Sequence, residues 1–304
     1  MYSCDLLVKI VRESDPVPFI TEYLASKLDP LIDLNQIAES YGRIEEVLQS
    51  FEEWLHEVWG IDFYKCLAST DYGWAIPKAL KKGSEINANV LVCDGLSIRE
   101  LLMLQKKMGD TLNYSLERTP APTTTENVSM KVFGSPNLKD AFRGETQYEG
   151  NTWHSDFIAD ITNPPRIGNQ RGHLFLTQYP DAPLHGARIH KTTQVQEISN
   201  VIKQLIELIE SLSRNAPLIV TGDHGYIYLG ANPARYLWGS APRKQERFGG
   251  EYGGNCLEID GKKVAVGRIH VNVGPGTNTF IAHGGVSLTE SLVPVITIKA
   301  SGTN

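Results

Sequence analysis

Carboxylate and imidazole side chains occur in this sequence where predicted strands end. Two apolar runs, residues 89–93 and 218–221, lead into Asp94-Gly95 and into Gly222-Asp223-His224-Gly225. Taken singly, an Asp-Gly step after a strand is often only a turn, because Asp bonds its own backbone and Gly accepts a positive φ. Taken together, three carboxylates and three imidazoles on neighbouring strand ends are expected to converge on one crevice. These residues are Asp94, Asp181, His185, Asp223, His224 and His283.

Carboxylates that converge in this way need a cation. Without one they repel each other and are driven towards protonation. Imidazole together with carboxylate suits zinc or manganese, whereas a site built only from oxygen suits magnesium or calcium. Two such cations ~4 Å apart are a known device for displacement at phosphorus. The residues therefore predict a metal site, and the chemistry still needs a nucleophile, either an activated water or a hydroxyl.

The hydroxyl candidates lie in the segment Pro122-Thr123-Thr124-Thr125-Glu126-Asn127. A hydroxyl at the start of a helix usually serves only as an N-cap. A helix N-terminus also supplies free amides and the positive end of a dipole, which suit a phosphoryl group. Three successive threonines leave open which of them is the nucleophile.

The elements that position these side chains change in type along the chain. From about residue 15 to 82 the pattern is helical, and residues 37–59 carry apolar side chains at helical spacing. After Gly83, strands alternate with helices, which predicts an α/β sandwich with ligands beyond the carboxyl ends of the strands. We expect an N-terminal helical region, 1–86, and an α/β domain, 87–304. In that domain we predict strands at 89–93, 173–177, 218–221 and 294–298, helices at 97–108 and 192–214, a hairpin within 256–273 around Asp260-Gly261, and a loop at 136–169.

Composition excludes several classes of protein. The 304 residues include 29 Lys and Arg against 35 Asp and Glu, a net charge of −6 that argues against nonspecific coating of nucleic acid. No apolar run approaches the ~20 residues that span a bilayer, and the first residues do not resemble a secretory signal. The four cysteines are far apart, which fits reduced thiols better than disulfides. We therefore expect a cytoplasmic protein that does not bind a membrane.

Five segments, in this order, resemble motifs of the alkaline phosphatase superfamily. They are Val-Cys-Asp94-Gly, Pro-Thr-Thr-Thr125, Asp181-x-x-x-His185, Thr-Gly-Asp223-His224-Gly and Ala-His283-Gly-Gly-Val-Ser-Leu-Thr-Glu-Ser-Leu-Val-Pro. The last segment looks most like PglZ-domain proteins. The resemblance covers roughly residues 89–299, and the N-terminal helical region matches nothing specific. The resemblance implies a three-layer sandwich of the alkaline-phosphatase-like type.

The resemblance also implies roles for individual residues. Thr125 would attack phosphorus in line, giving a phosphothreonine that water later hydrolyses. Asn127 and Arg247 would bind the phosphoryl group of the substrate. Zinc is the expected metal, with manganese or magnesium as alternatives. One cation would be held by Asp181, His185 and His283, and the other by Asp94, Asp223, His224 and the oxygen of Thr125.

The function that follows from the resemblance is hydrolysis of a phosphate ester, more readily a phosphodiester or a nucleotide-like or nucleic-acid substrate than a simple monoester. PglZ-domain proteins are associated with phage-defence systems, including the BREX type, so proteins of such a system are expected partners. The alternative is a non-catalytic PglZ-like scaffold that binds protein or nucleic acid in a defence complex. All seven proposed ligand positions hold residues able to bind metal, which argues against that alternative.

Several details of the assignment stay open at this point. Asn127 follows Thr125 at a spacing different from that in related phosphodiesterases, and Thr123 or Thr124 could supply the hydroxyl. His154 and His190 are further imidazoles that could replace a ligand. A sulfatase is disfavoured because no cysteine begins a Cys-x-Pro-x-Arg motif. A serine hydrolase is disfavoured because no Gly-x-Ser-x-Gly elbow occurs.

Overall fold

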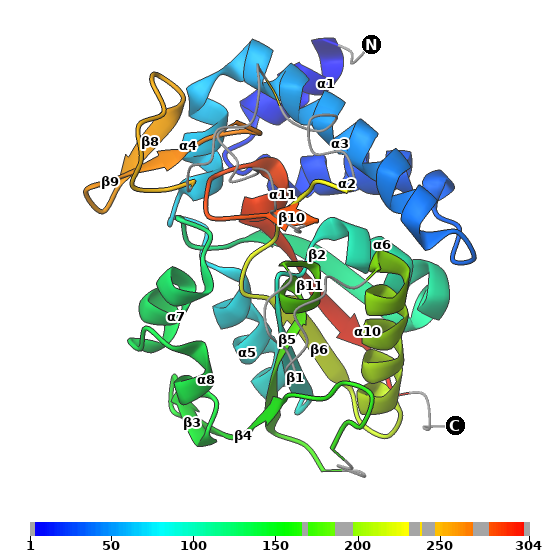
Figure 1. Cartoon of the computed structure of the whole chain (residues 1–304). Helices are drawn as coiled ribbons and strands as arrows, with labels where there is room; N and C mark the ends of the chain where they lie inside the picture. Colours follow the sequence, from blue (N-terminus) through cyan, green and yellow to red (C-terminus); the bar gives the residue numbers. More distant parts are fainter. Residues whose placement is uncertain are drawn as a thin grey trace.

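A seven-stranded mixed β-sheet forms the centre of the computed structural model, which describes residues 4–165, 170–185, 197–230, 238, 247–269 and 280–300 (Figure 1). The strand order is β2-β11-β6-β1-β5-β4-β3. The four strands predicted from apolar runs, β1, β5, β6 and β11, are all present and lie next to one another in the order β11-β6-β1-β5. The strand bounds are β1 Asn89–Asp94, β2 Leu112–Arg118, β3 Gly144–Tyr148, β4 Asn151–Ile158, β5 His173–Pro180, β6 Leu218–Gly222 and β11 Leu292–Ile298.

The direction of the strands decides where the functional side chains meet. β1 is parallel to both β5 and β6, and β4 is parallel to β5, whereas β2, β3 and β11 each pair antiparallel. The carboxyl ends of β1, β5 and β6 therefore lie at the same end of the sheet. In open α/β sheets, ligands bind just beyond the carboxyl ends of the strands.

Side chains alternate between the two faces of the sheet and join two separate cores. In β1, Leu91 and Cys93 belong to the first core, whereas Val90 and Val92 belong to the second. The central strands are buried on both faces, which is why they appear in the sequence as continuous apolar runs. The first core includes side chains of α2 Val17–Leu28, α3 Ile37–Trp59, α4 Ile61–Ala68, α6 Ile98–Met108 and α10 Ile198–Ser213; the second includes side chains of α5 Ala75–Glu85, α7 Thr125–Phe133 and α8 Leu138–Ala141.

The N-terminal helices share their core with the sheet. Residues of α2, α3 and α4 lie in the same hydrophobic cluster as residues of β1 and β6, and α1 (Cys4–Arg12) contributes Ile10. The last helix before the predicted boundary, α5, packs against the other face through Ile76 and Leu80. The division at residues 86 and 87 stays a prediction, and it separates segments that are buried together.

Two predicted elements of the α/β domain lie partly outside the described residues. The hairpin around Asp260-Gly261 is confirmed as β8 Cys256–Ile259 and β9 Lys262–Ala265, while residues 270–273 lie outside the described residues. The helix expected at 192–214 is α10 Ile198–Ser213; it begins later than predicted, since Glu197 is extended and is its N-cap, and residues 192–196 lie outside the described residues.

The loop predicted for 136–169 is wrong over about half of its length, and residues 166–169 lie outside the described residues. Residues 138–141 form α8, and β3 and β4 form a hairpin at the sheet edge. Thr146, Trp153 and Ser155 are buried along this hairpin. Its turn has Glu149 and Gly150 at positive φ. The pair at the turn is Glu-Gly and not the Asn-Gly or Asp-Gly that signals such turns in a sequence.

Among the described residues, no helix is both long enough and apolar enough to cross a bilayer.

Candidate metal centre

Two adjacent parallel strands deliver the first group of possible metal ligands. β1 ends at Asp94, and Asp223 and His224 directly follow β6. One carboxylate oxygen from each aspartate and one ring nitrogen of His224 all lie within 4.8 Å of one another. Three of the residues predicted to share one cation are therefore close enough to do so.

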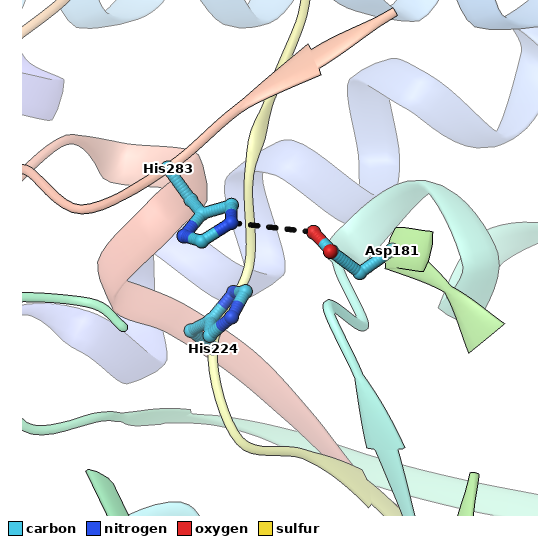
Figure 2. Close-up of side chains that lie close together, drawn as sticks. All are labelled: Asp181, His224 and His283. Carbon is cyan, nitrogen blue, oxygen red and sulfur yellow. Dashed lines mark ion pairs between the residues drawn. The ribbon is translucent and has the colours of Figure 1, made fainter. Parts of the chain in front are cut away.

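A second group of ligand atoms lies beside the first and contains Asp181, His224 and His283 (Figure 2). Asp181 begins α9 (Asp181–His185), which follows β5, and His283 follows the short strand β10 (Ile281–Ala282). The Nε2 atom of His283 is 3.4 Å from Oδ1 of Asp181. The rings of His224 and His283 stack with their centroids 4.2 Å apart. His224 thus lies at the junction of the two groups.

His185 is near this cluster without belonging to either group. Its ring lies 5.0 Å from that of His283, measured between centroids, and the residue is exposed. The resemblance assigned His185 to the cation held by Asp181 and His283. In the structure, His224 supplies the nitrogen at that position, and the ligand role of His185 stays a prediction.

The turn that carries Asp223 and His224 is fixed by two close approaches of the backbone. A Cβ atom on Gly225 would lie 2.0 Å from the carbonyl oxygen of Thr289, and one on Gly222 would lie 2.8 Å from Cβ of Leu96. Gly225 also donates its N–H to the carbonyl of Glu290 at 2.9 Å. Only glycine fits at these two positions, which explains the Gly-Asp-His-Gly spacing.

Backbone carbonyls orient both imidazoles. Nδ1 of His224 is 2.9 Å from the carbonyl oxygen of Gly225, and Nδ1 of His283 is 3.1 Å from that of Thr123. Because a carbonyl only accepts, each Nδ1 carries the proton and each Nε2 keeps its lone pair. Nε2 of His224 lies 3.5 Å from Oδ1 of Asp94 and 3.8 Å from Oδ2 of Asp223. Histidines that bind a metal through one ring nitrogen usually donate the N–H of the other to a backbone carbonyl or a carboxylate, as both rings do here.

The carboxylates lack cationic partners. Among the described residues, no lysine or arginine forms an ion pair with Asp94, Asp181 or Asp223. Oδ1 of Asp223 accepts N–H groups from Gly95 and His224, but its Oδ2 is buried with no hydrogen-bond partner, and so is Oδ1 of Asp181. Two such orphaned oxygens facing two unprotonated ring nitrogens are a donor set suited to zinc or manganese.

The electrostatics of the cluster lead to the same conclusion. Burial raises the pKa of Asp94 well above its ordinary value, and the neighbouring charges of Asp223 and Asp181 raise it further. Burial also lowers the pKa of His283 well below its ordinary value, with the adjacent His224 and His185 adding to the shift. Bound cations favour charged carboxylates and neutral imidazoles, so they would relieve both kinds of unfavourable interaction.

The structure separates the three threonines that the sequence left equivalent. Thr123 Oγ1 donates to the carbonyl of Gly285 at 2.9 Å and accepts the N–H of Gly284. Thr124 is the N-cap of α7, and its Oγ1 accepts the N–H of Asn127 at 3.2 Å. Thr125 Oγ1 instead lies 3.2 Å from Oδ1 of Asp94 and 3.3 Å from Nε2 of His224. Of the three hydroxyls, that of Thr125 faces the metal cluster.

The phosphate-binding role predicted for Arg247 stays a prediction, and most of the guanidinium's donors bond the protein itself. Its side chain is buried, and its guanidinium pairs with both carboxylate oxygens of Glu290, at 2.8 and 2.6 Å. Two further N–H groups bond the carbonyls of Gly267 and Ile269. Arg247 therefore fixes the loop that follows His283, and four of its five N–H groups are bonded within the protein. The Asn127 side-chain amide donates to the carbonyl of Pro122 at 2.9 Å, so its proposed contact with substrate competes with a bond inside the helix start.

Of the other two imidazoles raised by the sequence, His154 does not join the cluster. His154 lies on β4 opposite His173, at the amino-terminal end of β5, and lines a cavity of about 640 Å³ there. None of the metal-cluster residues lines that cavity. His190 lies outside the described residues.

A smaller cavity of about 260 Å³ adjoins the metal cluster and is lined by Asp94 and Thr125. Lys139 and Gln178 also line it, and the sequence analysis missed both of these residues. Neither belongs to a motif, so only their placement in the fold reveals them.

No protein-family model matches the chain, and no curated protein matches it.

Proposed function

We propose that this protein is a metal-dependent phosphoester hydrolase with an alkaline-phosphatase-like arrangement of its sheet and site. The single observation that carries the proposal is the placement of Thr125 Oγ1 against Asp94 and His224, at the edge of a cluster of carboxylates and imidazoles with orphaned donor atoms. The proposed link to phage defence rests only on the resemblance of residues 283–294 to PglZ-domain proteins.

Six residues would hold the cations: Asp94, Asp181, Asp223, His224 and His283, with Thr125 supplying its hydroxyl oxygen. Bound divalent cations would supply Lewis-acid stabilisation of charge on phosphoryl oxygens and would lower the pKa of the nucleophilic hydroxyl. His185 is close enough to His283 to remain a candidate for a further ligand.

The chain itself supplies the nucleophile and its orientation. Thr125 Oγ1 donates its proton towards Oδ1 of Asp94 and attacks phosphorus. A Thr125 oxygen–phosphorus bond forms as the bond from phosphorus to the leaving oxygen breaks, and the leaving oxygen takes up a proton as an alcohol. Water then hydrolyses the phosphothreonine, which releases phosphate or a phosphomonoester and restores the hydroxyl. The first turn of α7 holds Thr125 in place, because Thr124 caps the helix.

The test is turnover of bis(4-nitrophenyl) phosphate by purified protein with added zinc or manganese. Thr125→Ala is expected to reduce turnover at least 10²-fold, in line with removal of a nucleophile, whereas Thr125→Ser keeps a hydroxyl and retains measurable activity. Asp223→Asn is expected to abolish metal-dependent turnover. Asp110→Asn changes an exposed aspartate of the same type and is the matched control.

Two results would overturn the proposal. One is a wild-type rate no higher than that of Thr125→Ala and Asp223→Asn. The other is wild-type protein that binds neither zinc nor manganese in a metal analysis after dialysis. In either case a role as a non-catalytic binding module would replace the enzymatic one.

A further inference from the structure

The cavity beside Thr125 contains one cationic side chain. Of the residues that line it, Lys139 alone is a lysine or arginine, and the cavity also contains Asp94 and Thr125. Glu126, an exposed carboxylate at the start of α7, lines it as well. An ammonium group therefore shares a small space with the proposed nucleophile.

Local structure holds Lys139 at this position. Asn137 caps α8, and its side chain accepts the N–H of Lys139 at 3.1 Å. The neighbouring Leu138 is buried in the second core and anchors the turn. The Lys139 ammonium lies over the ring of Phe157, with Nζ 4.6 Å from the centroid. Such a contact holds a cation in place without neutralising its charge.

The charge of Lys139 is not used elsewhere. Among the described residues it forms no ion pair, whereas Lys65, Lys78, Lys107, Lys131 and Lys263 each pair with a carboxylate. A half-buried ammonium without a counterion, beside a nucleophile, is suited to bind an anion.

The two residues first expected to bind phosphate already donate hydrogen bonds to other groups of the protein. Arg247 is bound to Glu290, and the Asn127 amide is bound to Pro122. We propose that Lys139 binds a non-bridging oxygen of the substrate's phosphoryl group while Thr125 attacks phosphorus. This inference rests on the proposed function and names a substrate-binding residue for it.

The size of the cavity limits what surrounds that phosphoryl group. Its volume of about 260 Å³ is below the range of about 300–1,000 Å³ that is usual for pockets that enclose a drug-sized ligand. Leu138 and Leu176 give it apolar walls, and Gln178 contributes an amide. It fits a phosphoryl group with a small attached organic group, so a longer substrate would extend out of it.

The experiment compares Lys139→Met and Lys139→Arg with the matched control Lys106→Met, which changes an exposed lysine on α6. Three quantities are measured for each protein: zinc bound, the Kd for inorganic phosphate of the zinc-loaded protein by calorimetry, and kcat and KM on bis(4-nitrophenyl) phosphate. Lys139→Met is expected to bind zinc normally, to bind phosphate roughly 10-fold to 100-fold more weakly, and to raise KM more than it lowers kcat. Lys139→Arg is expected to recover most of the phosphate affinity.

The outcomes separate this inference from the proposed function. Phosphate affinity in Lys139→Met equal to that of wild type would overturn the role of Lys139, whatever the turnover. Wild-type protein that binds zinc but no phosphate would overturn it too. Wild-type protein that binds phosphate through Lys139 but does not hydrolyse the diester would contradict the proposed function and leave the phosphate site standing.

Discussion

Two clusters of buried carboxylates lie close together in this protein and differ in how their charge is balanced. In the candidate metal centre, Asp94, Asp181 and Asp223 have histidines beside them but no lysine or arginine in an ion pair among the described residues. In the second cluster, here called the arginine network, three glutamates pair with three arginines, and all are at most 2% exposed. The network contains Glu45, Glu52, Glu290, Arg99, Arg247 and Arg268.

The arginine network joins the N-terminal helices to the loops of the site. Arg268 pairs with Glu45 and Glu52, both on α3, and Glu52 accepts the N–H of Leu288 at 2.7 Å. Arg99 on α6 pairs with Glu45 and donates to the carbonyl of Tyr226. The segments that follow His224 and His283 are thereby attached to α3, so helices outside the resemblance support the metal centre.

The difference shows that the partners of a buried carboxylate indicate its role. Where the chain supplies its own cation, the carboxylate is part of the structure and its hydrogen bonds are satisfied. Where buried oxygens are orphaned, as in Asp181 and Asp223, folding has placed like charges together with no internal compensation. Such an arrangement is costly in the isolated chain, and a bound cation would remove the cost. The two clusters should therefore respond in opposite ways to neutralisation.

The largest expected effect is on the arginine network. Arg268→Met removes the partner shared by Glu45 and Glu52 and leaves buried charge uncompensated. We expect the free energy of unfolding to fall by about 3–5 kcal/mol, measured by urea denaturation. Lys65→Met, which breaks an exposed pair with Asp62, is the control and is expected to cost less than about 1 kcal/mol. Equal effects of the two substitutions would mean that the network does not bear on stability.

The next effect concerns the metal centre. Asp223→Asn keeps the oxygen that accepts N–H groups from Gly95 and His224 and removes one of the crowded charges. Without metal, this variant is expected to be as stable as wild type or more stable. At a zinc concentration 100 times Kd, wild type is expected to gain about 2.7 kcal/mol, and the variant little, as measured by urea denaturation with and without zinc. A large loss of stability in the metal-free variant would place Asp223 with the structural carboxylates.

The sequence predicted the parts of this picture that depend on local patterns. The apolar runs that became β1, β5, β6 and β11 are continuous because both faces of these strands are buried, and the polar residues after them were recognised for that reason. β2 was not predicted, because its buried positions, Leu112, Leu116 and Arg118, do not alternate regularly with exposed ones, and one of them is an arginine paired to Asp15. The β3–β4 hairpin was missed because its turn, Glu149-Gly150, is not a strong turn signal.

What the sequence could not predict depends on contacts between distant residues. Arg247 looked available for phosphate, and only the fold brings it to Glu290, 43 positions away. The three successive threonines differ in partner alone, since Gly285, Asn127 and Asp94 lie on three different segments. The position of His224 between both ligand groups, and the cavity that holds Lys139, likewise appear only in three dimensions.

The smallest expected effect tests whether the arginine network is itself fully balanced. Glu52 shares Arg268 with Glu45, and burial raises the pKa of Glu52 despite the opposing influence of Arg268; Glu290 adds to the rise. A raised pKa means that the folded protein binds this proton more tightly than the unfolded chain. The resulting stability is present below the unfolded pKa of about 4.3 and is lost as pH rises through the folded value.

Leu288 and Arg268 donate to different oxygens of Glu52, and Glu52→Gln stays neutral and keeps one of these two acceptors. The advantage of wild type over Glu52→Gln in free energy of unfolding is therefore expected to shrink as pH rises from about 4. The slope can be no steeper than about 1.4 kcal/mol per pH unit, since a single proton is involved. Urea denaturation of both metal-free proteins at several pH values measures it. An advantage that grows with pH would show that Arg268 outweighs burial at Glu52, and would make the network a fully compensated counterpart to the metal centre.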